Sequence, residues 1–315
     1  MHRFCILILI TAQLISGNIA FSQTSSILIY KTGFEYEEGF DPQISLIGQR
    51  GWTGEGSGWN GFIADELYFP GFGQQAYIGY SNFFPISQSS VVWKPLNYQV
   101  LTNYPVIKFS VIFQVKDSTN QRYDDFRWNV YNINTQRLFS LDFDNETLRI
   151  NYSLDTPGDF FFTGYTFSND GLYELVIAMN FSRNKWIATI NNVPIVEPLP
   201  MTTHGYSLNL GDIDAAWVLH NTSVPGDNYM VFDEFTVTAE QIVYPPKLSI
   251  VNILSNEPPK LIIFGEPATR CVIQKSTNLI HWVDVSTNYF VPNGVINWTG
   301  NLNTLFGFYR AKMSL

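Results

Sequence analysis

Two short acidic segments lie far apart in the chain: Gly33–Glu37 reads GFEYE, and Val231–Phe235 reads VFDEF. In both, carboxylates alternate with apolar side chains, as they do along a β-strand. The first and last strands of antiparallel sandwiches pair, so we expect the two segments to lie side by side. Facing carboxylates need a cation or a donor between them, and Ca²⁺ accepts six to eight oxygen ligands in flexible geometry. The sequence predicts calcium bound by Glu35, Glu37 and Asp233; the alternative is carboxylates on a solvated face or capping a turn.

A second set of polar residues alternates with apolar ones in the middle of the chain. It comprises Asp125, Arg127, Asn129, Asp142, Arg149, Asn151 and Glu174. On adjacent strands these side chains would form a row of alternating charge, and planar polar groups of this kind bind sugar hydroxyls. The alternative is a solvated face whose cross-strand ion pairs contribute under about 1 kcal/mol each. Arg127, Asp142, Arg149 and Glu174 are the candidate glycan-binding residues.

Aromatic residues crowd the Gly-rich stretch 51–73. Its glycines favour a loop, and aromatic rings on a loop can form stacking platforms for pyranose rings. They can equally close the end of a sandwich, where large rings bury the most area. Trp52 and Trp59 are the candidate platform residues, whereas Trp93 and Trp217 fit a core.

The remaining acidic segments, the histidines and the serine motifs give no support for a catalytic or metal site. The segments 210–214 (LGDID) and 225–228 (PGDN) resemble acidic turns. His204, His220 and His281 stand apart, without the spacing of zinc ligands. The sequence contains no Gly-x-Ser-x-Gly motif. These patterns favour a protein that is not an enzyme.

Many short strands are predicted before residue 244. Apolar and polar residues alternate within each, and no window of helical length shows a 3.6-residue apolar period. The predicted strands include 106–115, 125–131, 138–144, 148–154, 173–181 and 186–190. Strands at this spacing are typical of a sandwich or jelly roll.

A boundary is expected where two adjacent prolines, Pro245 and Pro246, stiffen the chain. The sequence therefore predicts a jelly-roll domain over 23–243, a linker over 244–247 and a small β-sandwich over 248–315. Cys271, in a strand-like run of the second domain, is expected to be buried and inert.

The first 22 residues have the features of a signal peptide: a basic start, an apolar run over 5–15 and a small-x-small site at Ala20–Ser22. Its removal would leave 17 basic and 27 acidic side chains, a balance that disfavours nucleic acid as a partner. No later stretch supplies the roughly 20 apolar residues of a transmembrane helix. We expect an exported bacterial protein that is secreted, held at the cell surface or periplasmic.

The opening Gly33–Glu35 element, the closing Phe232–Phe235 element and the hairpins between them resemble concanavalin A-like lectin/glucanase sandwiches of the laminin G type, over residues 28–243. The resemblance implies a structural calcium held by Glu35 and Asp233. The catalytic string of sandwich glucanases, Glu-x-Asp-x-x-Glu or Glu-x-Asp-x-Glu, is absent from this sequence, which disfavours hydrolysis.

The tail carries a resemblance of its own. The run 272–282 (VIQKSTNLIHW) and the closing 308–310 (FYR) resemble a small β-module that ends many large exported proteins of environmental bacteria. It is similar to an accessory sandwich of fibronectin type III kind and implies no activity. By this resemblance Trp282 and Tyr309 belong to the core.

Three functions are compatible with these features. The first is a non-catalytic, lectin-like protein that binds a polysaccharide or another glycan. The second is a structural or adhesive surface protein without glycan binding. The third is a divergent polysaccharide hydrolase or lyase, which the missing catalytic string disfavours.

Overall fold

The computed structural model describes residues 26–56, 62–65, 68–80, 88–156, 158–242, 247–252, 258–301 and 307–314. Strands dominate these ranges, and the helical elements are two 3₁₀ turns, η1 (Tyr36–Glu38) and η2 (Gln49–Gly51). Neither turn has the length or apolarity that a bilayer crossing requires. The predicted signal peptide, Trp59 and all of the predicted linker except Lys247 lie outside the described ranges.

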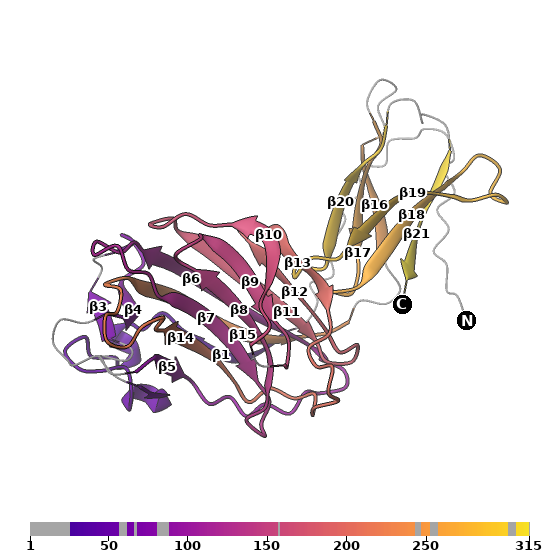
Figure 1. The fold of residues 1–315 in the computed structure, drawn as a ribbon. Helices are drawn as coiled ribbons and strands as arrows, with labels where there is room; N and C mark the ends of the chain where they lie inside the picture. Colours follow the sequence, from indigo (N-terminus) through magenta and orange to yellow (C-terminus); the bar gives the residue numbers. More distant parts are fainter. Residues whose placement is uncertain are drawn as a thin grey trace.

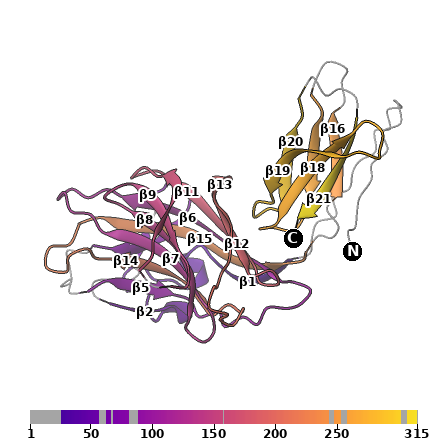
Figure 2. The same cartoon turned by 45° about the vertical axis from the view of Figure 1, so that its right-hand side comes forward.

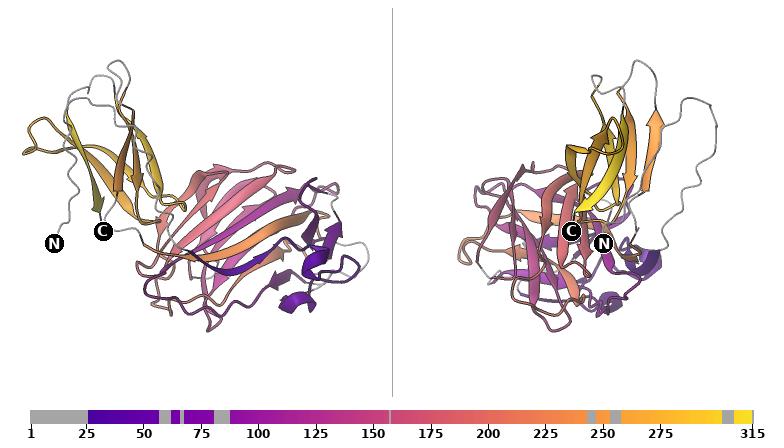
Figure 3. Two further views of the ribbon diagram at one scale, coloured as in Figure 1. Left: turned by 180° about the vertical axis from the view of Figure 1, so that it is seen from behind. Right: turned by 90° about the vertical axis from the view of Figure 1, so that its right-hand side faces the viewer.

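The larger part of the chain forms two antiparallel sheets, stacked as two layers (Figure 1). In spatial order the eight-stranded sheet consists of β13 (Val193–Leu199), β12 (Lys185–Ile190), β11 (Tyr173–Asn180), β6 (Val106–Lys116), β15 (Tyr229–Glu240), β4 (Gln74–Gly79) and β3 (Phe62–Asp65), with β1 (Ser26–Thr32) also paired to β15. The first and last strands of the sandwich therefore pair, as predicted, and they run side by side in the left view of Figure 3.

The seven-stranded sheet forms the second layer. In spatial order it consists of β10 (Phe161–Thr166), β9 (Arg149–Ser153), β8 (Arg137–Asp144), β7 (Asp125–Tyr131), β14 (Asp212–Val218), β5 (Ser90–Trp93) and β2 (Thr53–Glu55). The predicted all-β class, with a large sandwich of two antiparallel sheets followed by smaller sheets at the C-terminal end, is confirmed.

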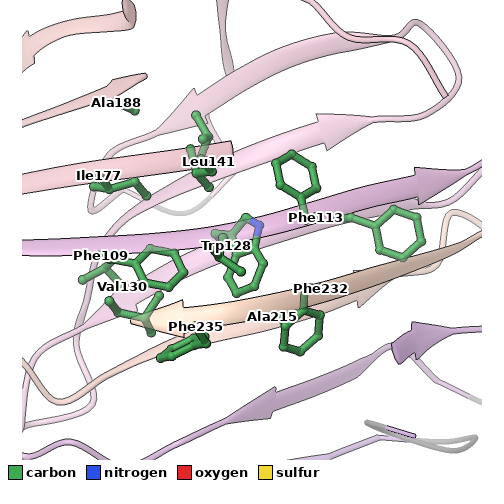
Figure 4. Packing of buried hydrophobic residues seen from close by; sticks show 14 of the residues in the cluster. Phe109, Phe113, Trp128, Val130, Leu141, Ile177, Ala188, Ala215, Phe232 and Phe235 are labelled. Atoms are coloured by element: carbon green, nitrogen blue, oxygen red, sulfur yellow. The ribbon is translucent and has the colours of Figure 1, made fainter. Parts of the chain in front are cut away.

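Large apolar side chains from both sheets fill the space between the layers. Phe109 of β6 and both Phe232 and Phe235 of β15 pack against Trp128 of β7 (Figure 4). Phe113 of β6 packs against Phe143 of β8. The alternation of apolar and polar residues places every second side chain in this core. The intervening residues consequently project from the outer faces of the two sheets.

Neither acidic segment forms a regular strand: the first leads into a turn and the second contains a bulge. β1 ends at Thr32, and Glu35 precedes the η1 turn instead of continuing the strand. In β15 the pairing register shifts between Asp233 and Thr236, and Glu234 adopts a left-handed φ of 51°. Because of this bulge, Phe232 and Phe235 both face the core although they are three residues apart.

Six strands form a C-terminal module of two three-stranded sheets. One sheet has the order β16 (Lys247–Asn252), β17 (Lys260–Phe264), β20 (Val295–Thr299), and the other β19 (Val283–Tyr289), β18 (Arg270–Ser276), β21 (Phe308–Ser314). Cys271 and Tyr309 are buried in its core, as predicted. Trp282 was predicted there but is only half-buried: Arg310 stacks on its ring at 4.2 Å, and its indole N–H donates to the carbonyl of Leu279.

The module contacts the outer face of the eight-stranded sheet near β11 and β12, at the end of the sandwich shown in Figures 1 and 2. Ala178 and Ile187 of the sandwich pack against Ala268 and Tyr289 of the module. Glu266, with no exposed surface, accepts hydrogen bonds from Asn180 Nδ2 at 2.5 Å and from Arg183 Nε at 3.3 Å. We call these contacts around Glu266 the junction.

Candidate functional site

The outer surface of the seven-stranded sheet carries the densest set of polar side chains that could bind or react with a ligand. We call it the polar face. Its members alternate with core residues along the strands: Asp125, Arg127, Asn129 and Tyr131 on β7; Ser140 and Asp142 on β8; Arg149 and Asn151 on β9; Asp212 and Asp214 on β14; and Trp93 on β5.

One hydrogen-bonded row crosses this face from β9 to the loop after β14. Asn151 Nδ2 donates to Asp142 Oδ2 at 3.3 Å, and Arg127 Nε donates to Asp142 Oδ1 at 2.5 Å. The same guanidinium lies 3.5 Å from Asp125 Oδ2, and His220 Nε2 lies 3.0 Å from that oxygen. Two charged groups that the sequence placed on one face, Arg127 and Asp142, therefore form its central ion pair.

A second row runs parallel to the first, two residues further along the strands. Arg137 Nη1 donates to Ser140 Oγ at 3.3 Å, and Ser140 Oγ donates to Asn129 Oδ1 at 2.5 Å. Asn129 in turn hydrogen-bonds the Asp214 carboxyl from the neighbouring strand. Asp214 is 6% exposed, and its Oδ1 has no hydrogen-bond partner among the described residues. A buried polar atom without a partner is costly, and such atoms mark places where a ligand or water can donate.

The carboxyls of the polar face hold protons more tightly than ordinary aspartates. Burial and the charge of nearby Asp142 together raise the pKa of Asp125 to about 6, against the opposing effects of His220 and Arg127. Burial alone raises the pKa of Asp212 to about 6. For His220, burial lowers the pKa, but its hydrogen bond and charge interaction with Asp125 outweigh burial and raise the pKa overall. Asp125 and Asp212 therefore change charge near pH 6, and carboxyls with such raised pKa values are candidates for proton transfer or pH-dependent binding.

Aromatic rings border the polar rows. Trp93, predicted to be a core residue, is half-buried on β5, beside Asp214 in the register. The sequence could not place it, because one short strand has two faces and either can be the inner one. On the opposite border, Arg127 lies 4.4 Å from the centre of the Phe160 ring and Arg149 5.1 Å from that of Phe162.

Of the remaining predicted ligand residues that the structure describes, Arg149 belongs to this face, and Glu174 and Trp52 do not. Arg149 is exposed at its border, over Phe162. Glu174 was expected on a strand adjacent to Asp142, but it lies on β11 of the other sheet, where it is exposed opposite Ile112. Trp52 is buried against Phe34, Phe232 and Phe235, and its Nε1 donates to Tyr30 Oη. Its ring is a core element and cannot serve as a sugar platform.

Several titratable residues of the polar face were not predicted there. The sequence predicts Asp212 and Asp214 in an acidic turn, but both lie within β14, where they alternate with Ile213 and Ala215. That alternation was the signal that could have identified the strand. His220 carried no signal, because its partner Asp125 is distant in the sequence.

Glu35 and Asp233, the predicted calcium ligands, both approach Gly33: a Cβ atom at that glycine would be 3.6 Å from Asp233 Oδ1 and 3.7 Å from Glu35 Oε1. Asp233 is fully buried, and its Oδ2 has no hydrogen-bond partner among the described residues. Burial, together with the charges of Glu234 and Glu35, raises the pKa of Asp233 to about 8. A buried carboxyl with an unpartnered oxygen beside a second carboxylate fits an oxygen-binding cation.

Glu37, the third predicted ligand, is exposed on the η1 turn. The carboxylate of Glu38 instead turns back to the strand, where it accepts hydrogen bonds from Thr32 Oγ1 and the Gly33 amide. Within the described ranges, no three His, Cys, Asp or Glu side chains are grouped as a metal site would require. Any cation here would depend on Glu35 and Asp233 together with other oxygen donors.

The protonation of Asp214 gives a direct test of the second row. Burial raises its pKa well above the ordinary value, so the folded protein holds this proton more tightly than the unfolded chain does. Asp214→Asn should therefore stabilise the protein, and the gain should grow as the pH rises from 4.5 to 6, since the wild type takes up a proton on folding over that range. Urea unfolding at the two pH values measures this, with exposed Asp159→Asn as the control. An equal effect at both pH values would contradict a protonated Asp214.

Comparison with protein families finds none that matches this chain, and comparison with curated proteins finds no match either. Among solved structures, basic winged bean lectin is 9% identical with a TM-score of 0.44, covering 70% of this chain and 99% of its own. Lectin II from Ulex europaeus is 7% identical with a TM-score of 0.43, covering 62% of this chain and 96% of its own.

A sialidase is 9% identical with a TM-score of 0.39, covering 56% of this chain. The chain spans 17% of the length of that sialidase and 31% of the length of a Trypanosoma rangeli sialidase. These similarities concern the arrangement of strands in a sandwich, and they identify neither a ligand nor an activity for this chain.

Proposed function

We propose that this protein is an exported glycan-binding protein whose polar face contacts the sugar. The observation that carries the proposal is the pair of parallel hydrogen-bonded rows, bordered on one side by Trp93 and on the other by Phe160 and Phe162. Sugars present hydroxyls beside apolar ring faces. Planar amide, carboxyl and guanidinium groups next to aromatic rings match both features.

The charges of the polar face favour a neutral glycan over an acidic one. Asp125, Asp142, Asp212 and Asp214 outnumber the arginines, and Arg127 is already paired with Asp142. Arg137 is occupied by Ser140, Ser153 and two backbone carbonyls. A uronic acid would meet these carboxyls, with exposed Arg149 at the border as the one arginine of the face left to offset them. Neutral hexose or pentose polymers are therefore the favoured ligand class.

Trp93→Ala should weaken binding of a neutral oligosaccharide about tenfold, because a lost aromatic contact of about 1.4 kcal/mol corresponds to that factor. Isothermal titration against oligosaccharides from glucan, xylan and mannan measures the change. Trp282→Ala, which removes a half-buried tryptophan from the C-terminal module, is the matched control. Unchanged affinity in Trp93→Ala, or no binding by the wild type with or without calcium, would favour the structural or adhesive alternative.

A hydrolytic function is the second candidate, and one specific observation favours it. Asp125 and Asp212 both have pKa values of about 6, the range in which a carboxyl can act as a general acid near neutral pH. Release of reducing sugar from mixed plant and algal glycans, lost in Asp125→Asn, would establish it. Binding without any release would support a non-catalytic protein.

We also propose that Glu35 and Asp233 hold a structural calcium ion. The unpartnered, buried Oδ2 of Asp233 supports this, since two carboxylates of the same charge need a cation to remain ionised side by side. Calcium would supply positive charge that fixes the start of the sandwich to β15. It would leave the polar face as the ligand site.

A further inference from the structure

The C-terminal module and the sandwich enclose a cleft of about 590 Å³ beside the junction. Its walls come from β10, β12 and β13 on the sandwich side and from β19, β20 and the turn between them on the module side. β10 and β13 are the edge strands of the two large sheets, and β19 and β20 are edge strands of the module's sheets. Four sheet edges therefore converge on one space, whose volume is that of a small-molecule site.

The lining of this cleft combines two tyrosine rings and several polar side chains with aliphatic ones. Tyr165, 42% exposed on β10, contributes one ring, and Tyr289 on β19 contributes another from the opposite wall. Thr287, Asn297 and Glu197 add a hydroxyl, an amide and a carboxylate, and none of these three side chains makes a hydrogen bond with another described residue. These polar groups are free to bind a ligand.

The lining also limits the charge of that ligand. It contains no lysine, arginine or histidine, and Glu197 is its one acidic side chain. An anionic ligand would find no cation there, and a hydrocarbon would leave the amide, hydroxyl and carboxylate unpaired, at the cost of their desolvation. A neutral, hydroxyl-rich molecule with apolar ring faces satisfies both conditions.

We infer that the cleft is a second glycan subsite, built jointly by the sandwich and the C-terminal module, that accepts a neutral oligosaccharide. The ligand class rests on the proposed function, whereas the place of the subsite rests on the cleft. The junction holds the two walls together, because buried Glu266 is bonded to Asn180 and Arg183 from the other side. The module is thus part of the binding surface.

The test uses full-length protein and titration calorimetry with cellotetraose, laminaritetraose, xylotetraose and mannotetraose as probes. The wild type should bind two molecules of one of these probes per chain. Tyr165→Ala and Asn297→Ala, which change opposite walls, should each weaken one of the two sites about threefold to tenfold and leave the other unchanged. Tyr36→Ala and Thr299→Ala are matched controls: Tyr36 is an exposed tyrosine that does not line the cleft, and Thr299 lies two residues after Asn297 on the same side of β20 but outside the lining.

The outcomes separate this inference from the proposed function. A single site that Trp93→Ala weakens, while Tyr165→Ala and Asn297→Ala leave it unchanged, would overturn the cleft and retain the polar face. A single site with the opposite response would retain the cleft and overturn the polar face. Binding of none of the four probes would overturn both.

Discussion

Arg127→Ala should lower the free energy of unfolding by about 3–5 kcal/mol at pH 8, the usual cost of leaving a buried carboxylate without its partner. The guanidinium is the cation that the first polar row places against Asp142 and near Asp125. Both aspartates are buried, so water cannot replace the lost charge. The expected loss therefore comes from two buried carboxylates that no longer have a nearby cation, and not from lost packing alone.

The loss in Arg127→Ala should also depend on pH, with a definite sign. Burial and the charge of Asp142 hold the pKa of Asp125 at about 6 with Arg127 present, above the value of about 3.9 in an unfolded chain. Removing Arg127 raises the folded pKa of both carboxyls further. An aspartate whose pKa is higher in the folded than in the unfolded state does not lower the free energy of unfolding when the pH is below the unfolded pKa. The loss of stability grows as the pH rises from the unfolded pKa to the folded pKa.

Urea unfolding of Arg127→Ala and wild type at pH 4 and pH 8 measures this dependence. The deficit should be small at pH 4 and full at pH 8. Arg149→Ala is the control, because Arg149 is exposed and stacks on Phe162 without a carboxylate partner in the described structure; its loss should cost under about 1 kcal/mol at either pH. A deficit in Arg127→Ala of the same size at both pH values would show that lost packing, not charge, is responsible.

Removing calcium should give the second large effect. Calcium at one hundred times its dissociation constant should stabilise the folded protein by about 2.7 kcal/mol, and a chelator should remove that gain. The binding should strengthen as the pH rises from 6 to 9, since calcium must displace the proton that the Asp233 carboxyl holds with a pKa of about 8.

Thermal unfolding with calcium and with chelator measures this effect. Asp233→Asn should abolish the response, because an amide cannot supply the negative charge. Glu37→Gln should retain it, because Glu37 is exposed on the η1 turn. An unchanged melting temperature in the wild type, with no metal in the purified protein, would rule out the calcium.

Alternation along single strands predicted much of this fold. The predicted strand Asp125–Tyr131 has the same bounds as β7, and its residues divide between core and outer face as expected. The pairing of Arg127 with Asp142 across the sheet could also be predicted, because a short turn joins their two strands and makes them neighbours. Local pattern and short connections were enough for this part of the site.

The errors have a common physical origin, which is contact between residues distant in the sequence. Glu174 shows the same alternation as Asp142, and the pattern of one strand does not reveal which of two sheets it joins. The predictions for Trp93 and Trp52 were both wrong for a related reason: Trp52 lies in the core and Trp93 on the outer face. Trp52 is in the core because Phe34, Phe232 and Phe235, which are distant in the sequence, pack around it. His220 meets Asp125 through a loop that no local rule places.

The buried Glu266 at the junction has a consequence for anyone who divides this protein into parts. Cutting the chain between the sandwich and the module would expose Ala178 and Ile187 on one piece and Ala268 on the other. It would also expose the buried Glu266 carboxylate to water and remove the hydrogen bond that Asn180 donates to it. Each fragment would then expose apolar side chains that are buried in the intact protein. The solubility of a fragment would therefore reflect the truncation rather than the native architecture.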